Sequence, residues 1–187
     1  MNLELLREQY SFELSRKQQL ESSLTLPVVV LTGLGGVAFS YGKTFSYSRN
    51  LQTLLFSVSL LGAILSFICV FYYLVRAAHR FMYEVIPSSL ELLSYHEEVK
   101  RYYQSVGVPF QAEIDFESRL KKAYAEASSK NRQNNISKAA YLYRANMGLV
   151  VGAVFLALCA GPYLANELAK PSPVQKVEIV NQQNSQK

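Results

Sequence analysis

Chemically reactive side chains are scarce in this sequence of 187 residues, which has only two histidines and two cysteines. His79 and His96 stand in no recognisable catalytic frame, and in HEEVK, which begins at His96, Lys100 takes the place of the second zinc ligand of HExxH. Cys69 and Cys159 fall in apolar stretches and predict neither a disulfide framework nor a zinc site. No GxSxG nucleophile motif occurs. We therefore expect neither an enzyme nor a metal or cofactor site.

Charged residues are missing from three long stretches: 24–41 has none over 18 residues, 51–75 none over 25, and 147–166 none over 20. A helix of 18 to 25 residues is roughly 27 to 37 Å long, which matches the hydrocarbon thickness of a bilayer. The alternative, three helices of a soluble core, normally keeps a polar stripe on each helix. The sequence therefore predicts an all-α membrane protein with transmembrane helices at 24–41, 51–75 and 147–166.

The end of the first stretch, GGVAFSYGKT, superficially resembles a phosphate-binding loop. Five residues separate Gly36 from Gly42, whereas that loop has four between its first glycine and its Gly-Lys pair. Tyr41 and Lys43 are instead residue types that favour the membrane interface. We interpret this segment as the exit of the first span.

Basic residues are distributed unevenly about the spans: 14 of the 19 lie in segments 1–23 and 76–146. The positive-inside rule then predicts a multi-pass protein of the cell inner membrane, with the N-terminus and 76–146 in the cytoplasm. The polar tail 167–187 would be a flexible segment on the opposite side.

Segment 1–23 has the pattern of an amphipathic helix that leads into the first span. Its apolar residues recur at spacings of three and four, on one face: Leu3, Leu6, Tyr10 and Leu14. Glu13 and Lys17 are placed to pair across one turn.

The sequence of segment 76–146 predicts a helical cytoplasmic domain. Ser88 and Glu91 form a capping-box pattern that opens one helix, and VGVPF (106–110) marks the turn that closes it. The next helix has the i,i+4 pairs Asp115–Arg119 and Glu117–Lys121. We expect NRQNN (131–135) to interrupt this helix before it resumes and enters the third span.

Small residues recur along the spans and predict close helix packing. They are Gly36 in the first span, Gly62 in the second, and the GxxxG pair Gly148 and Gly152 with Ala153 and Ala157 in the third. These residues either pack the three spans of one chain or join copies of it, and we expect a homo-oligomer through the third span. The span hydroxyls either line a narrow polar path or bond backbone carbonyls: Thr32, Ser40, Ser57, Ser59 and Ser66.

Basic residues interleaved with tyrosines follow the cytoplasmic helices, and such a set can hold phosphates and stack bases. The predicted ligand-binding residues are Lys121, Lys122, Lys130, Arg132, Lys138 and Arg144. We expect an anionic ligand there, a nucleotide or an oligonucleotide. The alternative is an ordinary solvated helix face in contact with anionic lipid.

The layout over residues 1–140, an amphipathic helix, two spans with a short loop and then a helical region, resembles the SLATT class of bacterial two-span effectors. More broadly it is similar to membrane effectors of anti-phage systems of the CBASS and Hailong type. The resemblance implies an oligomeric channel or membrane-disrupting effector controlled by a nucleotide. It rests on architecture and carries over no functional residue. The alternative function is a membrane-anchored scaffold for a soluble partner protein.

Overall fold

The computed structural model describes residues 2–79 and 81–170, and within these residues the chain forms five α-helices and no strand. The helices are α1 (Leu3–Ser22), α2 (Thr25–Thr44), α3 (Leu51–His79), α4 (Ser89–Ser105) and α5 (Phe110–Leu168). The prediction of an all-α chain is confirmed for these residues. Of the predicted flexible tail 167–187, residues 171–187 lie outside the described residues, whereas residues 167 and 168 are the last two of α5, contrary to the prediction.

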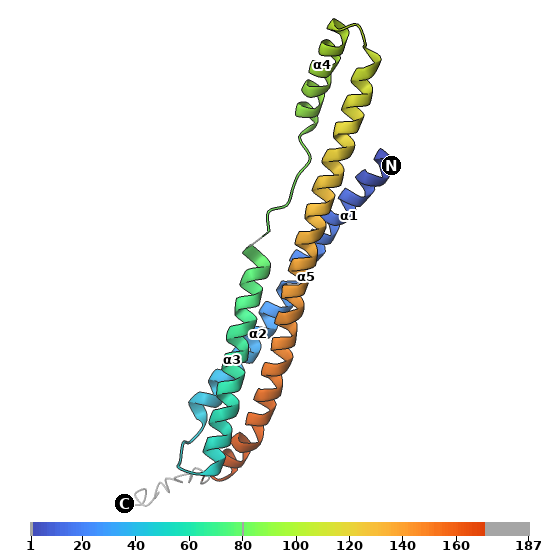
Figure 1. Cartoon of the computed structure of the whole chain (residues 1–187). Coiled ribbons are helices and arrows are strands. Elements are labelled where there is room, and N and C mark those ends of the chain that lie inside the picture. Colours follow the sequence, from blue (N-terminus) through green and yellow to red (C-terminus); the bar gives the residue numbers. More distant parts are fainter. Residues whose placement is uncertain (1, 80, 171–187) are drawn as a thin grey trace, which may run out of the picture.

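The molecule is elongated, and α5 runs along its whole length (Figure 1). This helix has 59 residues, so at 1.5 Å per residue it is about 88 Å long. The helix α3 packs along one half of α5 with α2 beside them, α4 packs along the other half, and α1 crosses α5 obliquely in between (Figure 1). We call α4 together with residues 110–146 of α5 the stalk.

Local sequence signals explain how the stalk begins and turns. The Ser88 hydroxyl accepts a hydrogen bond from the backbone N–H of Glu91, and the Glu91 carboxylate accepts one from the Ser88 N–H at 2.7 Å. The predicted capping box is therefore confirmed. The turn between α4 and α5 contains Gly107 with a φ of +76°, a conformation that costs glycine little. The predicted ion pairs Asp115–Arg119 and Glu117–Lys121 are also present, on the stalk part of α5.

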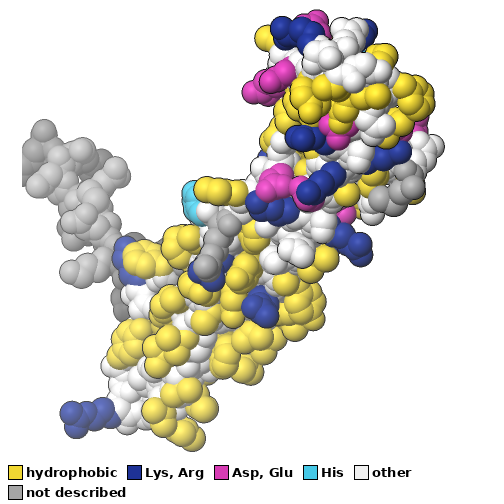
Figure 2. Space-filling view, turned by 45° about the horizontal axis from the view of Figure 1, so that its top comes forward, with side chains coloured by type: hydrophobic (Ala, Val, Ile, Leu, Met, Phe, Trp, Pro, Cys, Tyr) yellow, Lys and Arg dark blue, Asp and Glu magenta, His cyan; other side chains and the backbone are white. Residues whose placement is uncertain are grey.

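Among residues 2–79 and 81–170, three helical stretches are long and apolar enough to cross a membrane: Leu3–Thr44, Leu51–His79 and Phe110–Leu168. In their most apolar windows only 11%, 22% and 22% of the residues are buried within the chain. The helices of a soluble core would bury far more of this surface, because exposed apolar area is unfavourable in water. The apolar outer surface indicates a membrane protein (Figure 2).

The buried face of α5 forms a single seam that extends from the stalk into the apolar half. Its positions alternate at spacings of three and four: Ser128, Asn131, Asn135, Lys138, Leu142, Ala145, Leu149, Gly152, Leu156 and Cys159. The same spacing holds on α3 from Ala63 through Phe67, Val70 and Leu74 to Ala77. A repeat of 3.5 residues is the geometry of coiled-coil packing, which keeps one stripe against the partner helix.

Glycines bring α3 and α5 together. A Cβ atom on Gly148 would lie 2.6 Å from Cγ2 of Val70, and one on Gly152 would collide with the Phe67 ring. From the opposite helix, a Cβ atom on Gly62 would lie 2.8 Å from the Phe155 ring. All three contacts lie within one chain, so these glycines serve the packing of α3 on α5.

The expectation that NRQNN interrupts the helix is wrong, because α5 continues through residues 131–135 without a break. Asparagine is a poor helix former since its side chain competes for backbone groups. Here Asn131 and Asn135 are fully buried and bond to other segments of the chain. Tertiary contacts therefore outweigh the local preference.

The end of the bundle remote from the stalk is closed by polar and aromatic contacts. The side-chain amide of Asn166 bonds both the N–H and the carbonyl of Ser46, at 3.1 and 3.0 Å. Phe45 stacks on Phe56 with ring centroids 3.8 Å apart, and both rings are buried. These contacts fix the short connection between α2 and α3 against the last turns of α5.

Candidate functional site: the junction of stalk and spans

Two asparagines on α5 hold the segment that connects α3 to α4, and both are 0% exposed. The Asn131 carbonyl oxygen accepts a hydrogen bond from the Glu84 N–H, and its amide donates to the Glu84 carbonyl, each at 2.9 Å. This pair of bonds imitates a step of a β-ladder. It attaches an extended piece of backbone to the side of a helix.

Asn135 lies one turn further along α5 and joins three segments. Its amide donates to the backbone carbonyl and to the carboxylate of Glu13, both at 2.8 Å. Its carbonyl oxygen accepts from the Tyr83 hydroxyl at 2.7 Å. Glu13 is only 3% exposed, so this carboxylate depends on the asparagine for its buried partner. The predicted pairing of Glu13 with Lys17 is not what forms, since Lys17 lies over the Tyr83 ring, 4.7 Å from its centroid.

Further polar contacts surround the two asparagines. Lys138 donates to Glu21 of α1 at 3.3 Å, and Lys130 pairs with Glu84. The Tyr10 hydroxyl accepts from the N–H of Ile86 at 3.2 Å. The network thereby ties α1, the connecting segment and α5 together where the stalk meets the apolar bundle.

Burial raises the pKa of Tyr83, and the nearby carboxylates of Glu21 and Glu13 raise it further. A tyrosine already titrates near 10, so a higher pKa keeps the hydroxyl protonated throughout the physiological range. Tyr83 is therefore a permanent hydrogen-bond donor to Asn135.

The six predicted ligand-binding residues are not gathered into one site. They are spread along α5 from Lys121 to Lys122, Lys130, Arg132, Lys138 and Arg144, over roughly 35 Å at 1.5 Å per residue. Four of them have carboxylate partners in the same chain. Lys138 is 3% exposed, so its ammonium is part of the interior. Arg132 is exposed, and Arg144 lies over the rings of Tyr73 and Tyr141.

The predicted packing residues divide into two groups. Gly62, Gly148 and Gly152 are covered by side chains of the same chain. Ala157 is exposed, Ala153 is partly buried, and nothing lies within 4 Å of a Cβ atom placed on Gly36. Gly36 and Ala157 therefore face out from the bundle.

Hydroxyls in the spans satisfy carbonyls of the same bundle. Thr32 donates to the Val28 carbonyl at 2.9 Å, and Ser66 donates across to the Gly148 carbonyl at 2.8 Å. The sequence left open whether the hydroxyls line a polar path or bond backbone carbonyls. At Thr32 and Ser66 they bond backbone carbonyls.

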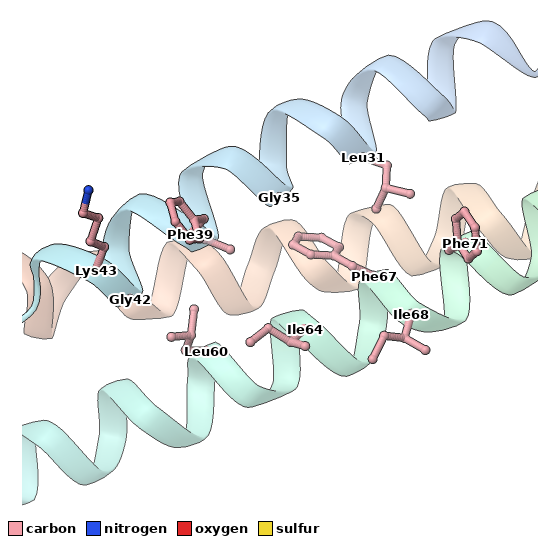
Figure 3. Close-up of a pocket in the computed structure, with 11 residues that line it drawn as sticks. Leu31, Gly35, Phe39, Gly42, Lys43, Leu60, Ile64, Phe67, Ile68 and Phe71 are labelled. Atoms are coloured by element: carbon pink, nitrogen blue, oxygen red, sulfur yellow. The ribbon is translucent and has the colours of Figure 1, made fainter.

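An apolar groove of about 850 Å³ separates α2 from α3. Figure 3 shows Leu31 and Phe39 of α2 facing Leu60, Ile64 and Phe67 of α3 across it. Glycines at two lining positions of α2, 35 and 42, help to keep the groove open, since they add no side chain. Lys43 lines the end of the groove that is nearer the α2–α3 connection.

Reactive groups outside the junction are few in the described part of the chain. His96 and Glu113 lie 3.0 Å apart between α4 and α5, with Glu113 largely exposed. Within residues 2–79 and 81–170, no group of three His, Cys, Asp or Glu side chains comes together to hold a metal ion.

In comparisons with known proteins, no family model, curated protein or solved structure matches the chain.

Proposed function

We propose that the protein is a multi-pass membrane effector that assembles with copies of itself, and that its stalk controls how the spans assemble. The observation that carries the proposal is the buried seam of α5, which passes without a break from the stalk into the third apolar stretch. A change at the stalk would therefore rotate or shift the third span as one body with it. The output would be a conducting or disrupting assembly in the bilayer.

The proposed orientation follows from charge. The stalk and α1 hold most of the basic residues, so we place them in the cytoplasm and the connection between α2 and α3 on the far side. The apolar exterior of α2, α3 and the second half of α5 would face lipid or other copies.

The hydroxyls of Thr32 and Ser66 bond backbone carbonyls of the same chain, so these two side chains do not line a polar path within one bundle. The proposal therefore requires several copies of the chain to assemble. Gly36 and Ala157 face outward and supply small surfaces at which copies can approach. A path for ions would then lie between chains.

The proposed control is an anionic ligand on the stalk, a nucleotide or oligonucleotide of the kind implied by the resemblance to bacterial anti-phage effectors. Such a ligand would have to bind one arrangement of the stalks more tightly than the other. Arg132 is exposed and is the predicted contact that we favour, because Lys121, Lys122, Lys130 and Lys138 already have carboxylate partners.

The second candidate function is a membrane-anchored scaffold for a soluble protein, and the tip of the stalk favours it. Val106 and Val108 are 53% and 51% exposed, and Phe110 is 78% exposed. Exposed apolar side chains at the end of a hairpin are a natural contact for a protein partner.

Entry of a membrane-impermeant dye on expression separates the two functions, because an effector breaches the membrane and a scaffold leaves it intact. We expect dye entry with the parent chain and its loss in Gln133→Pro, which breaks α5 between stalk and span at an exposed position. Gln133→Ala is the matched control and should behave as the parent. Intact membranes with a fully inserted parent chain would favour the scaffold.

A further inference from the structure

Two arginines and three tyrosines gather where α3 and α5 leave the apolar bundle. Both guanidinium carbons lie within 6.0 Å of the centroid of one ring, that of Tyr141: Arg76 at 5.7 Å and Arg144 at 6.0 Å. Arg76 also lies over Tyr72 at 5.8 Å, and Arg144 over Tyr73 at 5.9 Å. We call these five residues the arginine–tyrosine cluster.

The cluster gathers positive charge without a carboxylate. Within the described residues, no Asp or Glu oxygen lies within 4.0 Å of either arginine. The sequence explains this, since residues 127–166 of α5 contain no acidic residue and α3 contains none. The nearest lysine on α5, Lys138, is satisfied by Glu21, so that carboxylate is already engaged.

Arg76 is only partly satisfied. One of its terminal nitrogens donates to the Tyr141 hydroxyl at 3.4 Å, a long bond, while its Nε atom is buried and has no hydrogen-bond partner among the described residues. Buried donors are normally paired, so a donor of this kind is a place where an acceptor is missing. A guanidinium fork matches a phosphate or carboxylate group.

The depth of the cluster indicates where the acceptor comes from. Arg76 follows the charge-free run 51–75 directly, and Arg144 lies three positions before the run 147–166 begins. Both therefore lie at the boundary of the apolar bundle, where tyrosines are favoured and where lipid phosphates lie. This placement holds whichever way the protein is oriented in the membrane.

We propose that the arginine–tyrosine cluster binds a phosphate group, and that the group belongs to an anionic membrane lipid. Arg76 and Arg144 would donate to its oxygens, and the tyrosine rings would hold the two guanidinium groups in place. The site includes Arg144, one of the six residues predicted for a soluble ligand, but it uses neither Arg132 nor the stalk lysines, and it does not depend on the effector function. It depends only on the apolar helices lying in a bilayer.

Thermal unfolding of the full-length chain in detergent tests the site, with phosphatidylglycerol, phosphatidylcholine or inorganic phosphate added. We expect phosphatidylglycerol to raise the unfolding midpoint of the parent, and phosphatidylcholine to have a much smaller effect. In the double variant Arg76→Gln and Arg144→Gln, the phosphatidylglycerol concentration that gives a half-maximal shift of the midpoint should rise by about tenfold. This is the loss expected for one charge-assisted hydrogen bond. Arg101→Gln, which removes one exposed charge from α4, is the charge-matched control for Arg144→Gln, and it should respond as the parent does.

Arg144 is exposed, so Arg144→Gln alone tests the site if the double variant fails to fold. Arg144→Lys should keep part of the response, because it keeps the charge and loses the fork. An equal response of the parent to both lipids, or an unchanged response in Arg144→Gln and the double variant, would overturn the proposal. Stabilisation by inorganic phosphate but not by phosphatidylglycerol would overturn the lipid as the source and assign the cluster to a soluble phosphate.

Discussion

At the scale of single residues, Asn135 carries the most connections at the junction. It bonds Glu13 of α1 and Tyr83 of the segment before α4, and all three bonds lie between 2.7 and 2.8 Å. Such bonds matter less for their own strength than for what their loss leaves behind. A buried carboxylate without a donor bears its full desolvation cost.

Asn135→Ala should therefore destabilise the junction by about 1–3 kcal/mol, the cost of leaving a buried polar group unpaired. We expect a lower midpoint of thermal unfolding in detergent, and faster hydrogen exchange in α1. Gln133→Ala, two residues away and exposed, is the control and should change neither. A midpoint equal to that of the parent would show that the network contributes no stability.

Glu91 gives a second prediction at this scale, about pH. The backbone N–H and the hydroxyl of Ser88 lower the pKa of Glu91 below its ordinary value of 4.5. Because the folded-state pKa is the lower one, the stabilisation is complete above the unfolded value and is lost as the pH falls through the folded value. Hydrogen exchange at the start of α4 should therefore be slower in the parent than in Glu91→Gln above pH 4.5, and the difference should shrink as the solution is acidified below it. A difference that is constant with pH would exclude the carboxylate as its cause.

At the scale of elements, the packing of α3 on α5 depends on glycine. Any side chain at Gly152 would enter the space of the Phe67 ring, and Gly148 has Val70 in the same position. The two glycines that match the GxxxG pattern are thus used inside one chain. If copies of the chain associate, Gly36 is on an open face.

Replacing Gly148 and Gly152 with Ile should consequently lower the unfolding midpoint, because the two helices must separate or Phe67 must move. Gly36→Ile adds a side chain in open space and should leave the midpoint near that of the parent. The assembly mass in detergent, measured in parallel, reports on contacts between copies. If the Gly148 and Gly152 variant kept the parent's midpoint and lost mass, these glycines would join copies and not α3 to α5.

The elements that sequence reasoning predicted are those with local signals. The capping box at Ser88, the ion pairs within α5 and the apolar runs all involve residues at most a few turns apart. The junction has no such signal. Its seam follows a 3.5-residue repeat, but the repeat is occupied by Asn131, Asn135 and Lys138 and so does not read as apolar.

The carboxylate partners of two predicted ligand-binding lysines have no local signal either. Lys138 pairs with Glu21, 117 positions away in the sequence, and Lys130 pairs with Glu84, 46 positions away. Pairs at these separations form only once the chain is folded, so the carboxylate partners of the two lysines cannot be predicted from the sequence pattern. Without their partners they resemble an open site for an anion.

At the scale of the whole molecule, one long helix joins two environments. The stalk half of α5 carries charged and polar residues, and its other half is apolar and exposed (Figures 1 and 2). Polar contacts hold the connection of α2 and α3 at one end, and the asparagine network holds the base of the stalk. The proposed mechanism needs the apolar half of α5 to lie in the bilayer and the stalk half to lie in the cytoplasm.

Labelling of introduced cysteines by a membrane-impermeant maleimide tests this placement most directly. Ser48→Cys, in the exposed connection between α2 and α3, and Gln111→Cys, exposed at the start of α5, report on the two ends of the molecule. Cys69→Ala serves as the background for both, since Cys69 is exposed on the bundle. At an expression level at which the impermeant dye does not enter the cells, the account predicts that Ser48→Cys is labelled in intact cells and that Gln111→Cys is labelled only after permeabilisation. Labelling of Gln111→Cys in intact cells, or of neither residue until permeabilisation, would contradict it.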